Sequence, residues 1–154
     1  MRNAFVKEIT DIAQKNKKIV LLAGDIGYKL FDNFQKKYPQ RFYNCGVAEA
    51  NMTTVAAGLA LKGFTPITYT IATFNVYKTV EQIKIDICYP NLGVILVGVG
   101  SGLSYAGLGS THHALEDIAI LRSIPNLNIV SPADSFELKS LLHEVIKRKK
   151  PTYF

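Results

Sequence analysis

Segments of strand and helix character alternate along this sequence, and this alternation limits the possible fold more than any other feature. Residues 93–99 are almost wholly apolar, as expected of a central strand in a parallel sheet. On either side, segments with apolar residues at helical spacing alternate with other short apolar runs. The pattern predicts an α/β fold, with a mostly parallel sheet and helices on both faces.

The expected elements form one domain over residues 1–154, because no repeat, low-complexity tract or linker interrupts them. Ligands of such sheets bind beyond the carboxyl ends of the strands, so the loops after Ala23, Asn44, Ile71 and Val99 are the expected sites. The expected strands cover 18–23, 42–44, 66–71, 93–99 and 128–130, with 151–154 starting another. The expected helices cover 3–16, 29–37, 48–62, 74–89, 115–124 and 135–148.

Composition excludes several classes of protein. Hydrophobic residues make up 48% of the chain and charged residues 19%, which favours a packed core over disorder. No apolar run approaches the roughly 20 residues that span a bilayer, and the charged N-terminus does not resemble a signal peptide. We therefore expect a cytoplasmic protein without a membrane segment.

Neither the cysteines nor the basic residues indicate a site. Cys45 and Cys88 lack metal-ligand spacing and lie in apolar surroundings, which favours buried thiols over a disulfide or zinc site. The net charge of +6 comes from dispersed lysines, and the one dense run, 147–150, closes an expected helix, where the helix dipole favours cations. No basic and aromatic residues interleave, so we expect no nucleic-acid partner.

Two glycine segments fail the motifs that they approach. The dinucleotide pattern G-x-G-x-x-G fails in the loop at 98–102, because Leu103 and Tyr105 stand where its third glycine is required. Gly24-Asp25 begins the Gly-Asp-Gly motif that holds metal and diphosphate in thiamine enzymes, but Ile26 follows. We therefore expect no metal ligand in this chain.

Two other segments carry candidate site residues. Segment 44–52 places Glu49 at the start of a helix of small and apolar residues, where it is either a solvated acid favoured by the dipole or a functional carboxylate. Segment 107–117 places His112 and His113 between a glycine loop and a helix start. On composition alone, this is equally a capping Thr111 with two surface histidines or a catalytic site.

These segments resemble motifs of the transketolase family. Segment 44–52 is similar to G-[IV]-A-E-x-N-M, and segment 107–117 to G-x-T-H-[QH]-x-x-E-D. Segments 121–126 and 132–134 resemble L-R-x-[IL]-P-N and P-A-D. The resemblance spans residues from about 20 to 135 and implies the pyrimidine-binding domain, with the thiamine-diphosphate-binding fold, as in the C-terminal section or subunit of a split transketolase.

The resemblance implies roles for the candidate residues. Glu49 bonds the N1′ atom of the aminopyrimidine ring of thiamine diphosphate and activates the cofactor. His112 is a hydrogen-bonding or acid/base partner of substrate oxygens, and His113 is a second candidate for that role.

Three further positions are implied at the cofactor. Phe74 and Tyr77 match aromatic positions that pack on the pyrimidine ring, and Asp25 matches a turn near the cofactor. Because Phe74 and Tyr77 are three residues apart, they share a helix face, where aromatic residues more commonly belong to the core.

The implied reaction transfers a two-carbon ketol unit from a ketose or ketose phosphate to an aldose. Because Gly-Asp-Gly is absent, a diphosphate-binding partner subunit must bind the diphosphate and Mg²⁺. The implied assembly is a homodimer or heterotetramer. The implied substrates are small-molecule sugars.

Two departures from the family pattern keep alternatives open. Leu108 occupies a region where many transketolases carry an acid that recognises donor hydroxyls. The chain also stops at Phe154, where relatives continue, so a fragment is one interpretation of this sequence. A decarboxylating relative, such as a deoxyxylulose-phosphate synthase or a 2-oxoacid dehydrogenase beta subunit, and a non-catalytic regulatory homologue are the alternatives.

Overall fold

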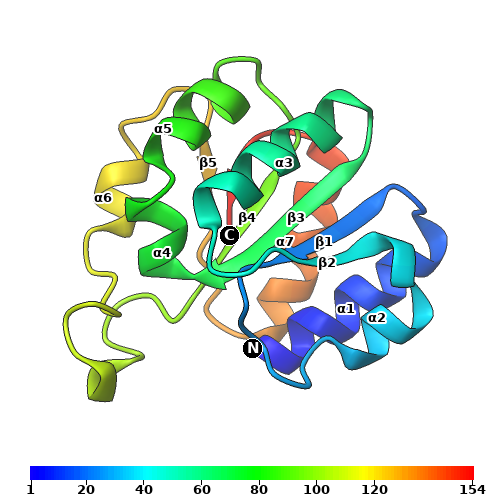
Figure 1. Ribbon diagram of the computed structural model, residues 1–154, viewed down its shortest axis with the longest axis horizontal. Helices are drawn as coiled ribbons and strands as arrows, with labels where there is room; N and C mark the ends of the chain where they lie inside the picture. Colours follow the sequence, from blue (N-terminus) through cyan, green and yellow to red (C-terminus); the bar gives the residue numbers. More distant parts are fainter.

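The computed structural model describes residues 1–154 and confirms the expected α/β architecture. Six parallel strands form one sheet in the order β2-β1-β3-β4-β6-β5, with helices on both faces (Figure 1). The strands are β1 (Ile19–Ala23), β2 (Phe42–Asn44), β3 (Thr65–Ile71), β4 (Ile95–Val99), β5 (Asn128–Ile129) and β6 (Thr152–Tyr153).

One face of the sheet is covered by α1 (Arg2–Lys15), α2 (Asp32–Lys37) and α7 (Ser135–Arg148). Alternate residues of β1, β3 and β4 point to this face, including Leu21 and Tyr69, where they pack with Ile9 and Leu142 in a core of 17 buried residues. Asp134 caps the start of α7, where its carboxylate accepts hydrogen bonds from two backbone N–H groups, and the helix ends in the expected basic turn.

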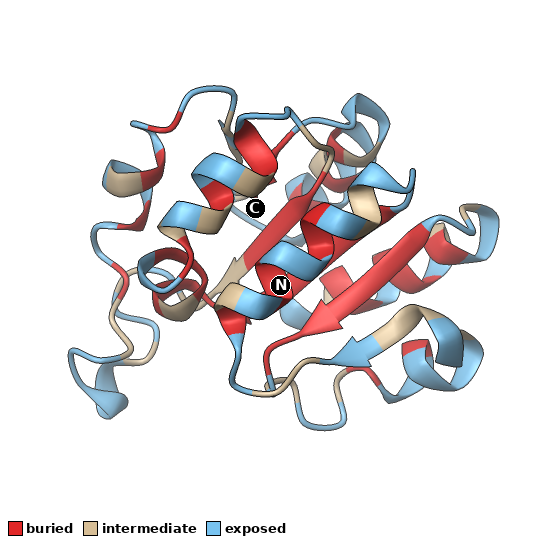
Figure 2. Ribbon diagram, turned by 45° about the horizontal axis from the view of Figure 1, so that its top comes forward, coloured by how far each residue is buried: buried red, intermediate tan, exposed pale blue.

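The opposite face carries the helices that hold most of the candidate residues. These are α3 (Glu49–Leu61), α4 (Ala72–Tyr77), α5 (Val80–Gln82), the π-helical η2 (Ile83–Cys88) and α6 (Asp117–Leu121). Met52, Ile87 and Leu96 belong to a second core of 14 buried residues between these helices and the sheet. Figure 2 shows the central strands buried between the two layers.

The expected single helix over 74–89 is wrong, because α4, α5 and η2 divide this segment. Thr79 lies between α4 and α5 with a φ of −131°, outside helical geometry, and its hydroxyl donates to the Asn75 carbonyl, a side-chain bond that competes with regular helical pairing. The expected helix over 115–124 is confined to α6. Two short 3₁₀ helices, η1 (Pro39–Arg41) and η3 (Ala106–Leu108), add to the expected elements.

The free cysteines differ in their burial. Cys88 is buried as expected, whereas Cys45 is only partly buried, because it follows β2 at the edge of the sheet.

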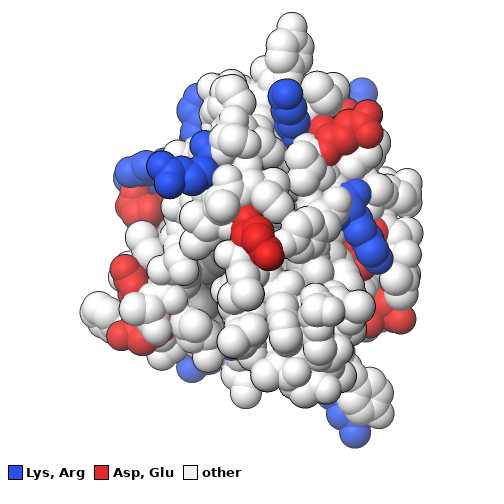
Figure 3. All heavy atoms as spheres, turned by 90° about the vertical axis from the view of Figure 1, so that its left-hand side faces the viewer, with Lys and Arg blue, Asp and Glu red and all other residues white.

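Lys, Arg, Asp and Glu side chains are scattered among uncharged ones on the face seen in Figure 3. No helix has the combination of length and apolar character that crossing a bilayer demands.

The carboxyl ends of the strands lie at one edge of the sheet, where the candidate residues gather. Chain order reverses beside β1, since β2 lies on one side of it and β3 on the other. Such a switch point opens a crevice in parallel sheets. The long loop after β4 projects from this edge, at the lower left of Figure 1.

Candidate functional site

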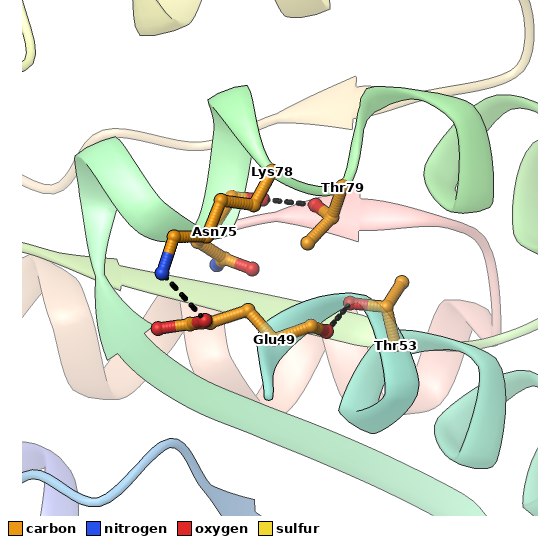
Figure 4. A network of polar contacts seen from close by, with 5 residues as sticks. All are labelled: Glu49, Thr53, Asn75, Lys78 and Thr79. Carbon is orange, nitrogen blue, oxygen red and sulfur yellow. Dashed lines mark hydrogen bonds and ion pairs between the residues drawn. The ribbon is translucent and has the colours of Figure 1, made fainter. Parts of the chain in front are cut away.

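Glu49 is the first residue of α3 and is buried, with 2% of its surface exposed. Its Oε2 atom lies 3.0 Å from Lys78 Nζ, and its Oε1 atom is buried without any hydrogen-bond partner. Figure 4 shows the carboxylate and the ammonium pointing toward one another from α3 and the end of α4. Burial rules out the solvated first-turn acid as an interpretation of Glu49.

A charged carboxylate reaches this interior position for two physical reasons. The N-terminus of α3 carries the positive end of the helix dipole, which favours an anion in the first turn. Lys78 supplies a compensating charge, without which a buried carboxylate is strongly disfavoured. Neither reason needs the second oxygen, so Glu49 Oε1 remains an available acceptor.

Phe74 lies beside this ion pair on α4. Lys78 Nζ is 4.6 Å from the centroid of the Phe74 ring, a cation–π distance, and the spacing of four residues places the two side chains on one helix face. Asn75, next to Phe74, is fully buried, and neither its amide nitrogen nor its amide oxygen has a partner. Carboxylate, ammonium and aromatic ring therefore form one contiguous group.

His112 joins this group from the loop after β4. Its ring centroid lies 5.2 Å from that of Phe74 and 6.2 Å from that of Tyr105, in edge contacts. Thr111 Oγ1 lies 2.9 Å from His112 Nδ1. Because this contact occupies Nδ1, Nε2 is the ring nitrogen that is free to bind another partner. Thr111 does not cap α6, because Glu116 precedes that helix.

The loop that carries His112 is fixed at its base. Gly102 and Ala114 form an antiparallel bridge, with N–H to carbonyl distances of 2.8 and 3.1 Å. Thr73 Oγ1 donates to the His113 carbonyl over 2.5 Å, and the buried His113 Nε2 has no partner. These contacts tie the histidine segment to α4.

Tyr77 turns toward a different partner from Phe74. Its hydroxyl donates a hydrogen bond to Glu116 Oε2, which raises the pKa of Tyr77 to about 12 and lowers the pKa of Glu116. The two side chains link α4 to the start of α6. Tyr77 is 45% exposed and so is not a core residue.

Asp25 and Leu108 lie outside this contiguous group. Asp25 follows β1 with a positive φ of 53°, and its Oδ1 accepts a hydrogen bond from Asn44 Nδ2 over 3.0 Å. Leu108 ends the short helix η3 and is 57% exposed. The structure thus brings Glu49, Phe74 and His112 together, whereas Asp25 lies in the loop after β1 and Leu108 in the loop after β4.

Sequence reasoning did not find Lys78 or Asn75. The available signal for Lys78 was its spacing of four residues from Phe74, which is typical of a contact on one helix face.

Sequence reasoning also missed a cavity of about 200 Å³ near the carboxyl ends of β4 and β6, whose lining includes Arg2, Tyr69 and Ser101. Burial is the main cause that raises the pKa of Tyr69. No three His, Cys, Asp or Glu side chains converge as metal ligands.

Known proteins resemble the chain over its whole length. The family described as "Transketolase, pyrimidine binding domain" matches residues 1–154. One of the subunits of apulose-4-phosphate transketolase from Phocaeicola vulgatus is 35% identical over 153 residues, covering 99% of this chain and 49% of the relative. A 1-deoxy-D-xylulose-5-phosphate synthase from Natranaerobius thermophilus is 38% identical over 149 residues, covering 96% of this chain and 23% of that protein.

A solved structure has a similar fold. The structure described as "Split gene transketolase, inactive beta4 tetramer" is 35% identical, with a TM-score of 0.88, and the match covers 99% of this chain and 49% of that one. The chain thus spans about half the length of the subunit relatives that it matches. Together with the buried Glu49 beside Phe74 and His112, these likenesses show that the chain belongs to the transketolase family, as its pyrimidine-binding domain.

Proposed function

We propose that this domain holds the aminopyrimidine ring of thiamine diphosphate in a transketolase. The reaction would transfer a two-carbon ketol unit from a ketose or ketose phosphate to an aldose acceptor. The single observation that carries the proposal is the buried, unpartnered Oε1 atom of Glu49, whose ion-pair partner Lys78 lies over the Phe74 ring. A protonated ring nitrogen would satisfy that oxygen, and the Phe74 ring offers an apolar surface to a flat ring, so the residues fit this group.

Thiamine diphosphate supplies the carbanion chemistry of such reactions, and the protein supplies binding, orientation and electrostatics. In this proposal Glu49 holds a proton at the N1′ atom, because it is the buried carboxylate with a free oxygen. The positive end of the α3 dipole and the Lys78 ammonium lie beside the Glu49 carboxylate. Phe74 provides the surface for the ring.

His112 is our candidate for exchanging protons with substrate oxygens. Its Nδ1 atom is in contact with Thr111, so Nε2 can donate to or accept from a substrate. Edge contacts with Phe74 and Tyr105 support the ring orientation. His113 is a second candidate, because its Nε2 atom is buried and has no partner.

Roles for three other residues remain part of the proposal. Tyr77 and Asp25 would contribute to the cofactor pocket from the ends of α4 and β1. Leu108 would line the donor end of the site, on the same loop as His112.

We further propose a partner that holds the diphosphate and Mg²⁺. The chain lacks Gly-Asp-Gly, and of its relatives one is named a transketolase subunit and another a split gene transketolase. A homodimer or heterotetramer with a diphosphate-binding subunit would complete the site. The two free thiols are consistent with a reducing compartment such as the cytoplasm.

A decarboxylating reaction is the second candidate function. Leu108 gives the loop an apolar side chain in the region where many transketolases carry an acid for donor hydroxyls, and the Natranaerobius relative is named a deoxyxylulose-phosphate synthase. Such an enzyme would use Glu49 in the same way and would release CO2 from a 2-oxoacid.

The test is reconstitution of the chain with its diphosphate-binding subunit. Calorimetry would measure thiamine diphosphate binding in the presence of Mg²⁺, and two assays would compare ketol transfer from a ketose with CO2 release from pyruvate. We expect weak binding and no turnover by the chain alone, and tight binding with ketol transfer by the complex. Micromolar binding by the chain alone would contradict the need for a partner. Binding by the complex without turnover would indicate a regulatory homologue.

A further inference from the structure

Lys78 occupies the space between two groups that the proposed function assigns to the cofactor ring. Its Nζ atom lies 3.0 Å from Glu49 Oε2 and 4.6 Å from the centroid of the Phe74 ring. Figure 4 shows the lysine side chain extending back from the end of α4 toward the carboxylate. One ammonium group therefore contacts both the acid and the aromatic surface.

The two partners of the ion pair differ greatly in exposure. The side chain of Lys78 is 46% exposed, whereas that of Glu49 is 1% exposed. Lys78 can leave toward solvent by rotating its flexible side chain, and its charge would then be hydrated. Glu49 has no such route, so it needs a new partner whenever Lys78 leaves.

A flat ring stacked on the face of Phe74 that Lys78 covers cannot share this space with the ammonium. Atoms of stacked rings approach to roughly 3.5–4.0 Å, and Lys78 Nζ already lies over the ring face at 4.6 Å from its centroid. Stacking therefore requires the ammonium to move from this face. When it moves, the hydrogen bond to Glu49 Oε2 is also lost or rearranged.

We propose that Lys78 is a positioning residue that competes with the aminopyrimidine for the face of Phe74 and gives up its bond to Glu49 Oε2 when it is displaced. In the free chain it balances the charge of Glu49 and covers the aromatic face, and it swings out when the cofactor ring enters. The inference rests on the proposed function, because it assumes that this site receives an aminopyrimidine.

If Lys78 competes with the cofactor ring, removing the Lys78 ammonium should increase the affinity of the protein for thiamine diphosphate. Lys78→Met removes the competitor and leaves Glu49 without a cation in the free protein. Thiamine diphosphate should then bind about tenfold more tightly, a factor similar to that of one charge-assisted hydrogen bond. A lysine that merely supports the fold would give weaker or unchanged binding on removal.

The experiment measures Kd by calorimetry for thiamine diphosphate with Mg²⁺ in the complex with the diphosphate-binding subunit. Lys78→Arg keeps the charge and should retain the wild-type Kd. Lys84→Met is the matched control, since Lys84 is an exposed lysine on η2 without an ion pair. Unchanged or weaker binding by Lys78→Met would overturn the inference, because Lys78 would then remain on Glu49 while Oε1 receives the ring.

A second measurement uses the wild-type complex and does not depend on the folding of a variant. Acetylation of lysines, followed by peptide mass spectrometry, reports the reactivity of each ammonium group. Addition of thiamine diphosphate should increase the labelling of Lys78 relative to Lys84. Unchanged or reduced labelling contradicts displacement. Absence of cofactor binding by the wild-type complex would instead remove the proposed function itself.

Discussion

The hydroxyl of Tyr153 donates a hydrogen bond over 2.9 Å to Asp117 Oδ2, and this buried contact joins β6 to the start of α6. The other oxygen of Asp117 accepts from the Ile118 N–H over 2.8 Å. Burial is the largest cause that raises the pKa of Tyr153, and the Asp117 charge adds to it. Tyr153 therefore remains protonated and keeps its role as donor.

Tyr153→Phe should lower the free energy of unfolding by about 1–3 kcal/mol, because it leaves a buried carboxylate oxygen without its partner. Urea denaturation measures the change. Tyr43→Phe is the matched control, since Tyr43 is exposed and its hydroxyl bonds only the nearby Gln40 carbonyl. Because the pKa of Tyr153 is raised on folding, wild-type stability should fall as the pH rises above about 10, and Tyr153→Phe should lose less there.

Gly98 is required for the close approach of Tyr153 to β4. A Cβ atom at this position would lie 2.4 Å from the Tyr153 hydroxyl oxygen and 2.7 Å from Cε2. Gly98→Ala should therefore destabilise the protein by about 1–3 kcal/mol, the usual range for overpacking. Gly58→Ala in α3 is the control, because a Cβ there meets nothing within 4 Å, and it should stabilise the helix. Equal urea midpoints for the two variants would contradict this account of Gly98.

The sequence predicted the α/β fold and named Glu49 and His112 as candidates, but it did not predict the division of residues 74–89 into α4, α5 and η2. The alternation of strands and helices is a local pattern, and so are the motifs that carry Glu49 and His112, which is why they could be read directly. Lys78 could not be found in this way, because its importance comes from contacts between α3 and α4 that only the packed structure brings together. Gly98 stood out only through a dinucleotide pattern that fails, whereas in the structure it lies in β4 and is required for space beside Tyr153, 55 positions later in the sequence.

The Tyr77–Glu116 contact should be visible as a late phenol titration. The pKa of Tyr77 is raised to about 12, mainly by its hydrogen bond to Glu116, so Glu116→Gln should bring it closer to the usual value of about 10. As the pH rises through about 12, Tyr77 loses the proton that it donates and the contact opens. Ultraviolet absorbance measures phenolate formation, with Tyr77→Phe subtracted to isolate this residue. Glu144→Gln, an exposed change on α7, should leave the titration of Tyr77 unaltered.

Leu108 should control the preference for hydroxylated donors. An apolar side chain cannot accept a hydrogen bond from a donor hydroxyl, and a site without that acceptor discriminates poorly for the hydroxyl. Leu108→Asp should therefore raise the ratio of kcat/KM for a hydroxylated donor to that for its deoxy analogue. Leu103→Asp changes a similarly exposed leucine of the same loop and should not raise the ratio. Equal ratios for wild type and Leu108→Asp would remove Leu108 from the substrate site.

Glu49→Gln should abolish most of the activity of the reconstituted complex while the fold stays intact. Glutamine keeps the size of the side chain, and its carbonyl oxygen can still accept the hydrogen bond from Lys78. It cannot hold a proton at the N1′ atom as a carboxylate does. Positioned acid/base groups contribute on the order of 100-fold to 10,000-fold in rate, and we expect a loss of this size in kcat.

The two interpretations of Glu49 differ in what its charge does. A carboxylate that only favours the dipole and pairs with Lys78 affects stability, so neutralising it would leave the rate of the bound complex almost unchanged. The measurement compares kcat for ketol transfer with hydrogen–deuterium exchange at C2 of the bound cofactor, using circular dichroism to verify folding. Glu81→Gln is the control, because Glu81 is an exposed first-turn acid of α5 without an ion pair. If Glu49→Gln retains both rates within about threefold, well below the acid/base range, Glu49 is not the activating group.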